Sequence, residues 1–110
     1  MKSLIFIFLT SLLLINCTEV QEVNTITTVE LKKLLSKDKI QLIDVRTQRE
    51  VKQGFIETAL FIDYFDKNFL IKVNRAVNKK RPVYLYCRSG NRSGKATKIL
   101  LENGFEVYNV

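Results

Sequence analysis

The sequence predicts an α/β domain with a parallel sheet and helices on both of its faces. Apolar, strand-like runs alternate with amphipathic segments, an order that implies parallel strands joined by right-handed crossovers. The length of 110 residues suits one domain. Hydrophobic residues make up 46% of the chain, so most of its length can contribute to a buried core.

A helix and a strand are expected first. Thr27 and Glu30 have the spacing of a capping box, and leucines at 31, 34 and 35 mark one face of the short helix that follows. Residues 40–44 (IQLID) are typical of a buried strand, and this strand ends in the acidic residue Asp44.

Two helices and an apolar run follow. A short helix is expected over residues 47–53, with Gly54 as its C-cap. Residues 59–62 form the second apolar run. Asp66 is the expected cap of a longer helix whose apolar face extends through Val77.

The last third of the chain predicts a strand, a helix and a strand. Residues 82–86 (PVYLY) are β-branched and aromatic, as in a central strand. Residues 93–103 are expected to be helical, with Ala96, Ile99 and Leu100 facing inward and Gly104 ending the helix. Residues 105–110 are expected to form the final strand.

Two polar residues stand where such a sheet places its ligands. Ligands of open α/β sheets bind beyond the carboxyl ends of the strands, and Asp44 and Cys87 both come at predicted strand ends. Caps and turns also use polar residues at strand ends, so position alone leaves both interpretations open.

The loop from Cys87 to Arg92 (CRSGNR) carries the chemistry. It precedes a helix near Ser93, and the first N–H groups of a helix are unpaired and carry partial positive charge. Those donors, together with Arg88 and Arg92, would lower the pKa of the Cys87 thiol and would also hold an anion. The alternative is a buried structural cysteine, which does not readily explain two arginines and two glycines beside it.

The chain has two cysteines and no histidine. The lack of histidine removes Cys-His nucleophiles and most zinc sites, and we expect neither a metal nor a cofactor.

The segment from Tyr86 to Ser93 (YCRSGNRS) resembles the active-site loop of single-domain rhodanese-like sulfurtransferases. Upstream, Asp44-Val45-Arg46, Glu50, Gly54 and Ile56 resemble the pattern D-V-R-x-x-x-E-x-x-x-G-x-I of the same family. The resemblance covers residues 24–110 and implies a rhodanese fold. Phe55 and Glu57-Thr58 depart from the histidine and Pro-Gly that most members have there. Members usually continue with a Gly-Gly turn, a tryptophan and a last helix, so this C-terminal helix is expected to be missing after Val110.

The resemblance implies transfer of a sulfane sulfur from a donor such as thiosulfate to a thiol or cyanide, through a persulfide on Cys87. It implies Arg88, Ser89, Gly90, Asn91, Arg92 and Ser93 as the substrate-binding loop. Asp44 and Arg46 are expected to support the site without taking part in the chemistry. The expected partners are a small anionic sulfur donor and a thiol acceptor.

Two alternatives concern the same domain. The C-x4-R spacing of Cys87 and Arg92 is one residue shorter than the C-x5-R loop of related phosphatases, which favours sulfur over a phosphoryl group. A non-catalytic module that binds a partner or carries a persulfide is the second alternative. The intact cysteine and arginines favour the enzyme.

Residues 1–16 are expected to be a signal peptide of the lipoprotein type. Lys2 precedes an apolar core from Leu4 to Ile15, which is too short to span a membrane. The segment ends at Cys17 in a sequence that resembles a bacterial lipobox, although Asn16 departs from the usual small residue. Cys17 is therefore the expected lipidation site, followed by a tether through residue 23.

Ordinary secretion and a retained anchor helix are the alternatives, and all three place the domain outside the cytoplasm. The expected location is a bacterial periplasm or cell envelope. If Cys17 is acylated, Cys87 has no partner within the chain, and an unpaired thiol in an exported protein indicates intermolecular pairing or a reactive function.

The formal net charge of +7 favours anions. The lysines and arginines of the chain are scattered over predicted helix faces and turns. Together with the export signal, this scatter leads us to expect no nucleic-acid partner.

Overall fold

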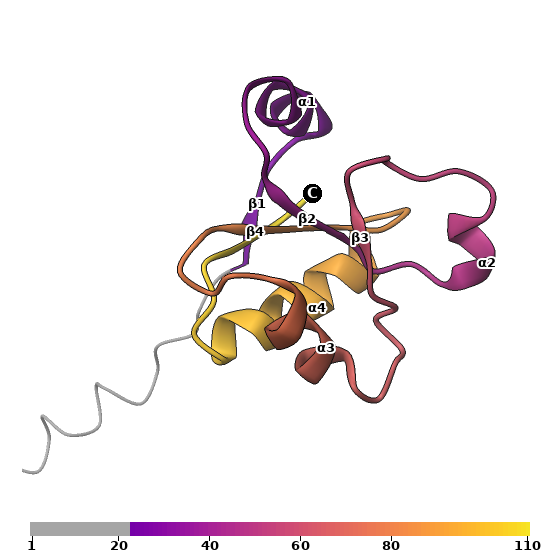
Figure 1. Ribbon diagram of the computed structural model, residues 1–110, viewed down its shortest axis with the longest axis vertical. Helices are drawn as coiled ribbons and strands as arrows, with labels where there is room; N and C mark the ends of the chain where they lie inside the picture. The colour runs from indigo at the N-terminus through magenta and orange to yellow at the C-terminus, as the bar shows by residue number, and fades with distance from the viewer. Residues whose placement is uncertain (1–22) are drawn as a thin grey trace, which may run out of the picture.

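The computed structural model describes residues 23–110, and five parallel strands form its sheet in the order β1-β5-β4-β2-β3 (Figure 1). The strands are β1 (Asn24–Thr25), β2 (Gln41–Asp44), β3 (Leu60–Phe61), β4 (Val83–Tyr86) and β5 (Val107–Asn109). The predicted parallel sheet is confirmed.

Four helices connect the strands: α1 (Thr28–Lys37), α2 (Gln48–Val51), α3 (Phe69–Ala76) and α4 (Asn91–Glu102). In Figure 1, α1 lies on one side of the sheet, and α3 and α4 lie on the other. Helices therefore cover both faces, as the sequence predicts.

The main core lies between the sheet and helices α3 and α4. Alternate residues of the central strands point into it, because successive side chains of a strand face opposite sides. Its fully buried members are Ile43, Val45, Val73, Val83, Leu85, Ala96, Leu100 and Val107. This packing anchors β4 and α4, the two elements that flank the Cys87 loop.

The predicted capping box is confirmed, since Glu30 N–H donates to Thr27 Oγ1 and the Glu30 carboxylate accepts from Thr27 N–H. Thr47 and Glu50 form a second capping box at α2. Gly104 ends α4 at a φ of 83°, with its N–H donating to Leu101 O, an arrangement that favours glycine.

Three predicted helix boundaries are wrong, and the final strand, Val107–Asn109, is shorter than the predicted range of residues 105–110. Helix α4 begins at Asn91 and not at Ser93, because Gly90 adopts a left-handed conformation and starts the helix two residues earlier. Asp66 does not cap α3, since its carboxylate accepts from Asn68 N–H in a turn before the helix. Helix α2 ends at Val51 with Lys52 as its C-cap, ahead of Gly54.

Strand β1 was not predicted, because its two exposed residues carry no apolar pattern. It pairs with β5 through the backbone, with Asn24 opposite Tyr108. The predicted signal peptide and the lipidation of Cys17 lie outside the described residues. Among the described residues, no helix is long and apolar enough to cross a membrane.

Candidate active site

The predicted site residues Asp44 and Cys87 meet at the carboxyl edge of two neighbouring strands. Asp44 ends β2 and lies opposite Tyr86, the last residue of β4, which Cys87 follows directly. The Val45 N–H donates to the Tyr86 carbonyl over 3.1 Å and extends this pairing beyond the strands. The sheet thus brings together two segments that are about 40 residues apart in the sequence.

Three donors converge on the sulfur of Cys87. The N–H of Gly90 lies 3.1 Å from Sγ, the N–H of Ser93 lies 3.4 Å away, and the Ser93 hydroxyl lies 3.3 Å away. Cys87 is 9% exposed and is the free cysteine of the described residues. An anionic sulfur at this point would be held by hydrogen bonds on its protein side.

The backbone of Gly90 explains why the donors converge. Its φ of 84° lies in the left-handed region, which is open to glycine and unfavourable for other residues. This conformation turns the chain directly into α4, so that Ser93 falls in the first turn of the helix. The N–H groups of that turn have no partner within the helix and are free to face the sulfur.

Burial acts to raise the pKa of the Cys87 thiol, but hydrogen bonds outweigh it and hold the pKa below its ordinary value. The Ser93 hydroxyl contributes most to the lowering, followed by the N–H groups of Ser93, Ser89 and Gly90. The sequence pointed to the two arginines beside the thiol as part of the cause. The structure gives the larger part to the serine and the backbone.

Ser93, predicted as part of the substrate-binding loop, lies against the sulfur of Cys87. The residue is fully buried, and its hydroxyl faces Cys87 Sγ. It therefore stabilises the thiolate by donating hydrogen bonds to Sγ from the protein side. Ser89 and Asn91 are exposed on the loop, where a bound molecule could reach them.

Arg92 is held by an ion pair. Its Nη1 and Nη2 donate to the two carboxylate oxygens of Glu50 over 2.6 and 2.8 Å. Hydrogen bonding to this carboxylate raises the pKa of Arg92, and the same contact lowers the pKa of Glu50 to about 2. Arg92, predicted as part of the substrate-binding loop, is thus already paired with Glu50.

Asp44 and Arg46 form a second pair at the base of the site. The Asp44 carboxylate accepts from the backbone N–H, Nε and Nη2 of Arg46, with Nη2 at 2.7 Å. It also accepts from the Tyr86 hydroxyl at 2.7 Å. Arg46 Nη2 donates in turn to the carbonyl of Gly54, which fixes the loop after α2.

Glu50 and Tyr86 are contributors to which sequence reasoning assigned no role. Glu50 was noted only as part of a family pattern, and Tyr86 only as the end of a strand and the first residue of the segment that resembles the active-site loop. The available sequence signal for a role of Glu50 was its spacing from Arg46, because both residues follow shortly after the end of β2. No local pattern could have shown that the Tyr86 hydroxyl bridges Asp44 and the N–H of Ile56.

A hollow of about 180 Å³ borders the loop at Arg88. Its lining residues are Arg46, Glu50, Gln53, Gly54 and Arg88. Arg46 and Glu50 are engaged in the pairs described above, whereas the exposed Arg88 shows no ion pair within the described part of the chain. Arg88 is therefore the cation in this hollow that is open to an incoming anion.

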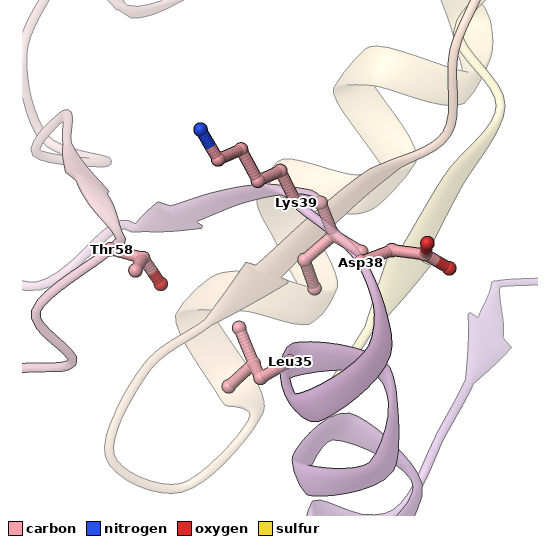
Figure 2. A pocket seen from close by; sticks show the side chains of 5 residues that line it. Leu35, Asp38, Lys39 and Thr58 are labelled. Atoms are coloured by element: carbon pink, nitrogen blue, oxygen red, sulfur yellow. The ribbon is translucent and has the colours of Figure 1, made fainter.

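A larger hollow of about 400 Å³ lies elsewhere, between the end of α1 and the start of β2, lined by Leu35, Asp38, Lys39, Ile40 and Thr58 (Figure 2). It lies at the amino ends of β2 and β3, whereas Cys87 follows the carboxyl end of β4. Figure 2 shows the Asp38 carboxylate and the Lys39 ammonium pointing in different directions, so their charges do not converge on one ligand.

Comparisons with known proteins agree on one family. A sequence model described as Rhodanese-like domain matches residues 27–110. The chain is 36% identical over 90 residues to YtwF of Bacillus subtilis, a protein named provisionally as a sulfurtransferase, covering 81% of this chain and 84% of that protein. It is 35% identical over 75 residues to a protein of Allochromatium vinosum named sulfurtransferase, covering 67% of this chain and 66% of that one.

A solved structure agrees with these sequence matches. The crystal structure of a rhodanese-like domain protein from Staphylococcus aureus superposes with a TM-score of 0.72 at 36% identity. The match covers 80% of this chain and 84% of the other.

Proposed function

The chain belongs to the rhodanese-like domain family, and from this premise we propose that it transfers a sulfane sulfur atom through a persulfide on Cys87. The observation that carries the proposal is the convergence of the Gly90 N–H, the Ser93 N–H and the Ser93 hydroxyl on Cys87 Sγ. These donors favour the anionic forms of the sulfur, which are the thiolate before transfer and the persulfide after it.

In the first half-reaction, the Cys87 thiolate attacks the outer sulfur of a donor such as thiosulfate. A bond forms between Sγ and that sulfur, the S–S bond within thiosulfate breaks, and its electron pair leaves with sulfite. The thiolate and the thiosulfate dianion together carry three negative charges, and the persulfide anion and sulfite carry the same three. No proton or external electron is needed.

In the second half-reaction, an acceptor thiolate or cyanide attacks the outer sulfur of the persulfide. The S–S bond to Cys87 breaks, and Sγ takes the electron pair and returns to the thiolate. The products are an acceptor persulfide or thiocyanate. Because Cys87 is the leaving group here, a lowered thiol pKa assists this step as well.

The loop favours sulfur over phosphoryl transfer. Cys87 and Arg92 are separated by four residues, one fewer than in the related phosphatases. Glu50 also engages both terminal nitrogens of Arg92, which leaves that guanidinium less able to clamp a phosphoryl group. A single sulfur atom bound to Sγ requires less space and fewer donors.

Arg88 is the proposed donor-binding cation. It lines the hollow of about 180 Å³ beside the loop, where the other charged groups, Arg46 and Glu50, are already paired. An anionic donor in this hollow would be attracted by Arg88 while its sulfur approaches Cys87. The formal net charge of +7 supports the same class of donor.

Thiosulfate:cyanide turnover by the purified chain tests this proposal. We expect thiocyanate to form with the wild type and to fall to background in Cys87→Ser. Cys17→Ser is the matched control and is expected to retain turnover. Equal thiocyanate formation by wild type and Cys87→Ser would rule out an enzyme that works through this thiol. Rhodanese-like domains that only bind or carry sulfur would give that result.

We also propose that the chain is exported to a bacterial cell envelope and anchored by acyl chains on Cys17. The apolar segment from Leu4 to Ile15 and the cysteine that closes it support this. Metabolic labelling with a fatty acid in a bacterial host should label the wild type and leave Cys17→Ala unlabelled. Full-length, unlabelled wild-type protein in the cytoplasmic fraction would contradict export and anchoring.

A further inference from the structure

Asn109, in strand β5, contacts the Cys87 loop at Gly90. It is 8% exposed, and its side-chain nitrogen Nδ2 donates to the Gly90 carbonyl over 3.1 Å. Because a carbonyl only accepts, this contact fixes which end of the amide faces the loop. Asn109 therefore contacts the glycine whose N–H points at Cys87 Sγ.

The Gly90 carbonyl is held from two sides. It accepts from Asn109 Nδ2 and also from the N–H of Gly94 over 3.0 Å, within the first turn of α4. Gly94 itself approaches Asn109 closely, since a Cβ atom at position 94 would stand 3.3 Å from Nδ2. Both glycines thus let the amide of Asn109 reach the backbone at the start of the helix.

The side-chain oxygen of Asn109, Oδ1, indicates that Asn109 does more than stabilise the fold. Asn109 Oδ1 is buried and has no hydrogen-bond partner in the part of the chain that the structure describes. A buried acceptor without a partner lowers the stability of the folded state. An apolar side chain of similar size would avoid this loss, so stability alone does not account for an amide here.

We propose that Asn109 is a positioning residue, whose amide holds the Gly90 carbonyl so that the N–H groups of Gly90 and Ser93 stay aimed at Cys87 Sγ. This inference rests on the proposed function, because it concerns the same thiol. Gly90 is in the left-handed conformation, and its two peptide planes are the ones that must stay fixed. Asn109 does not touch the sulfur and acts through Gly90.

Arg92 of α4 interacts electrostatically with the Cys87 thiol. Its guanidinium is paired with Glu50 of α2 and also interacts electrostatically with Asp63. Asn109 is uncharged and sits on β5. Its replacement by leucine therefore changes hydrogen bonding at Gly90 and leaves these charges unchanged.

The test measures how fast iodoacetamide alkylates Cys87 in the full chain as pH varies, with peptide mass spectrometry separating Cys87 from Cys17. Asn109→Leu should lower the rate at pH 6 by about threefold to tenfold, corresponding to a pKa shift of up to about one unit. Its melting temperature should be equal to or above that of the wild type. Asn109→Asp should slow alkylation further, because a carboxylate cannot donate and adds negative charge. A wild-type rate profile in Asn109→Leu would overturn the proposal.

Two further variants complete the test. Asn103→Leu alters an exposed amide at the other end of α4 and should alkylate at the wild-type rate. Gly94→Ala places a methyl group close to Asn109 Nδ2 and should displace the amide from the Gly90 carbonyl. It should therefore slow alkylation of Cys87, as Asn109→Leu does. If Asn109→Leu does not fold, an unchanged profile in Gly94→Ala overturns the proposal and a slowed one supports it. Because alkylation needs no sulfur donor, these results are independent of whether the wild type forms a persulfide.

Discussion

The carboxylate of Glu50 and the guanidinium of Arg92 form a two-pronged ion pair that links residues 42 positions apart in the sequence. The pair ties α2 to the first turn of α4, the turn whose N–H groups face Cys87. Glu50 also completes the capping box of α2 with Thr47. The Glu50 carboxylate therefore caps the start of α2 and also holds the guanidinium of Arg92 in place.

This ion pair predicts a stability change in acid. The pKa of Glu50 lies at about 2 in the folded protein, below its ordinary value of 4.5, so the folded state favours the charged form. The stabilisation is present above about pH 4.5 and is lost as the pH falls towards 2. Glu50→Gln should lack this contribution, so its unfolding free energy, measured by urea denaturation, should fall less between about pH 5 and pH 2.

The exposed Glu57 offers the control, because Glu57→Gln makes the same chemical change on the same connecting segment. Its acid profile should follow that of the wild type. Parallel profiles for Glu50→Gln and the wild type would show that the ion pair contributes nothing to acid stability.

Ser93→Ala is predicted to raise the pKa of the Cys87 thiol. The substitution removes the hydroxyl that donates to Sγ and keeps the N–H of the same residue in place. A hydrogen bond to a charged group contributes about 1.5–3 kcal/mol, so the thiolate fraction at neutral pH should fall by about tenfold to a hundredfold. The ultraviolet absorbance of the thiolate at increasing pH measures this change. Ser36→Ala, on the exposed face of α1, should leave the titration as in the wild type.

Gly90→Ala and Gly104→Ala are a matched pair. Both glycines have nearly the same positive φ, 84° and 83°, so both substitutions should destabilise the fold by about 1–2 kcal/mol. Of these two glycines, only Gly90 donates its N–H to Cys87 Sγ. Gly90→Ala should therefore also slow alkylation of Cys87, whereas Gly104→Ala should change stability alone. The same alkylation rate in both variants would argue against an essential loop geometry.

Tyr86→Phe is predicted to destabilise the fold by about 1–3 kcal/mol, because it leaves the buried Asp44 carboxylate with one donor fewer and the Ile56 N–H without its acceptor. Urea denaturation measures the change. Tyr108→Phe removes a hydroxyl that bonds to the exposed Glu106 and should cost less than about 0.5 kcal/mol. Equal losses in the two variants would contradict the bridging role of Tyr86.

The sequence was sufficient to predict the order of the elements from α1 onwards and the place of Cys87 after β4, because both depend on local patterns. The apolar run of β4 and the glycine-rich loop after it are contiguous in the chain. The capping box of Thr27 and Glu30 is likewise local. These features do not depend on how distant segments meet.

The contacts that complete the site depend on the tertiary fold, and sequence reasoning missed them for that reason. The pairing of Arg92 with Glu50 and the contact of Asn109 with Gly90 each join separate elements of the chain. The start of α4 was also wrong by two residues, since the left-handed conformation of Gly90 is decided by the loop as a whole. Ser93 could be placed against the thiol only once that start was known.

Mass spectrometry of the chain after treatment with thiosulfate and removal of excess donor tests the central claim most directly. We predict a gain of one sulfur atom, located on Cys87 by peptide mapping and reversed by cyanide. Cys87→Ser should show no gain, and Cys17→Ser should behave as the wild type. A wild-type chain whose Cys87 acquires no sulfur from thiosulfate or from a more reactive persulfide donor would contradict the account.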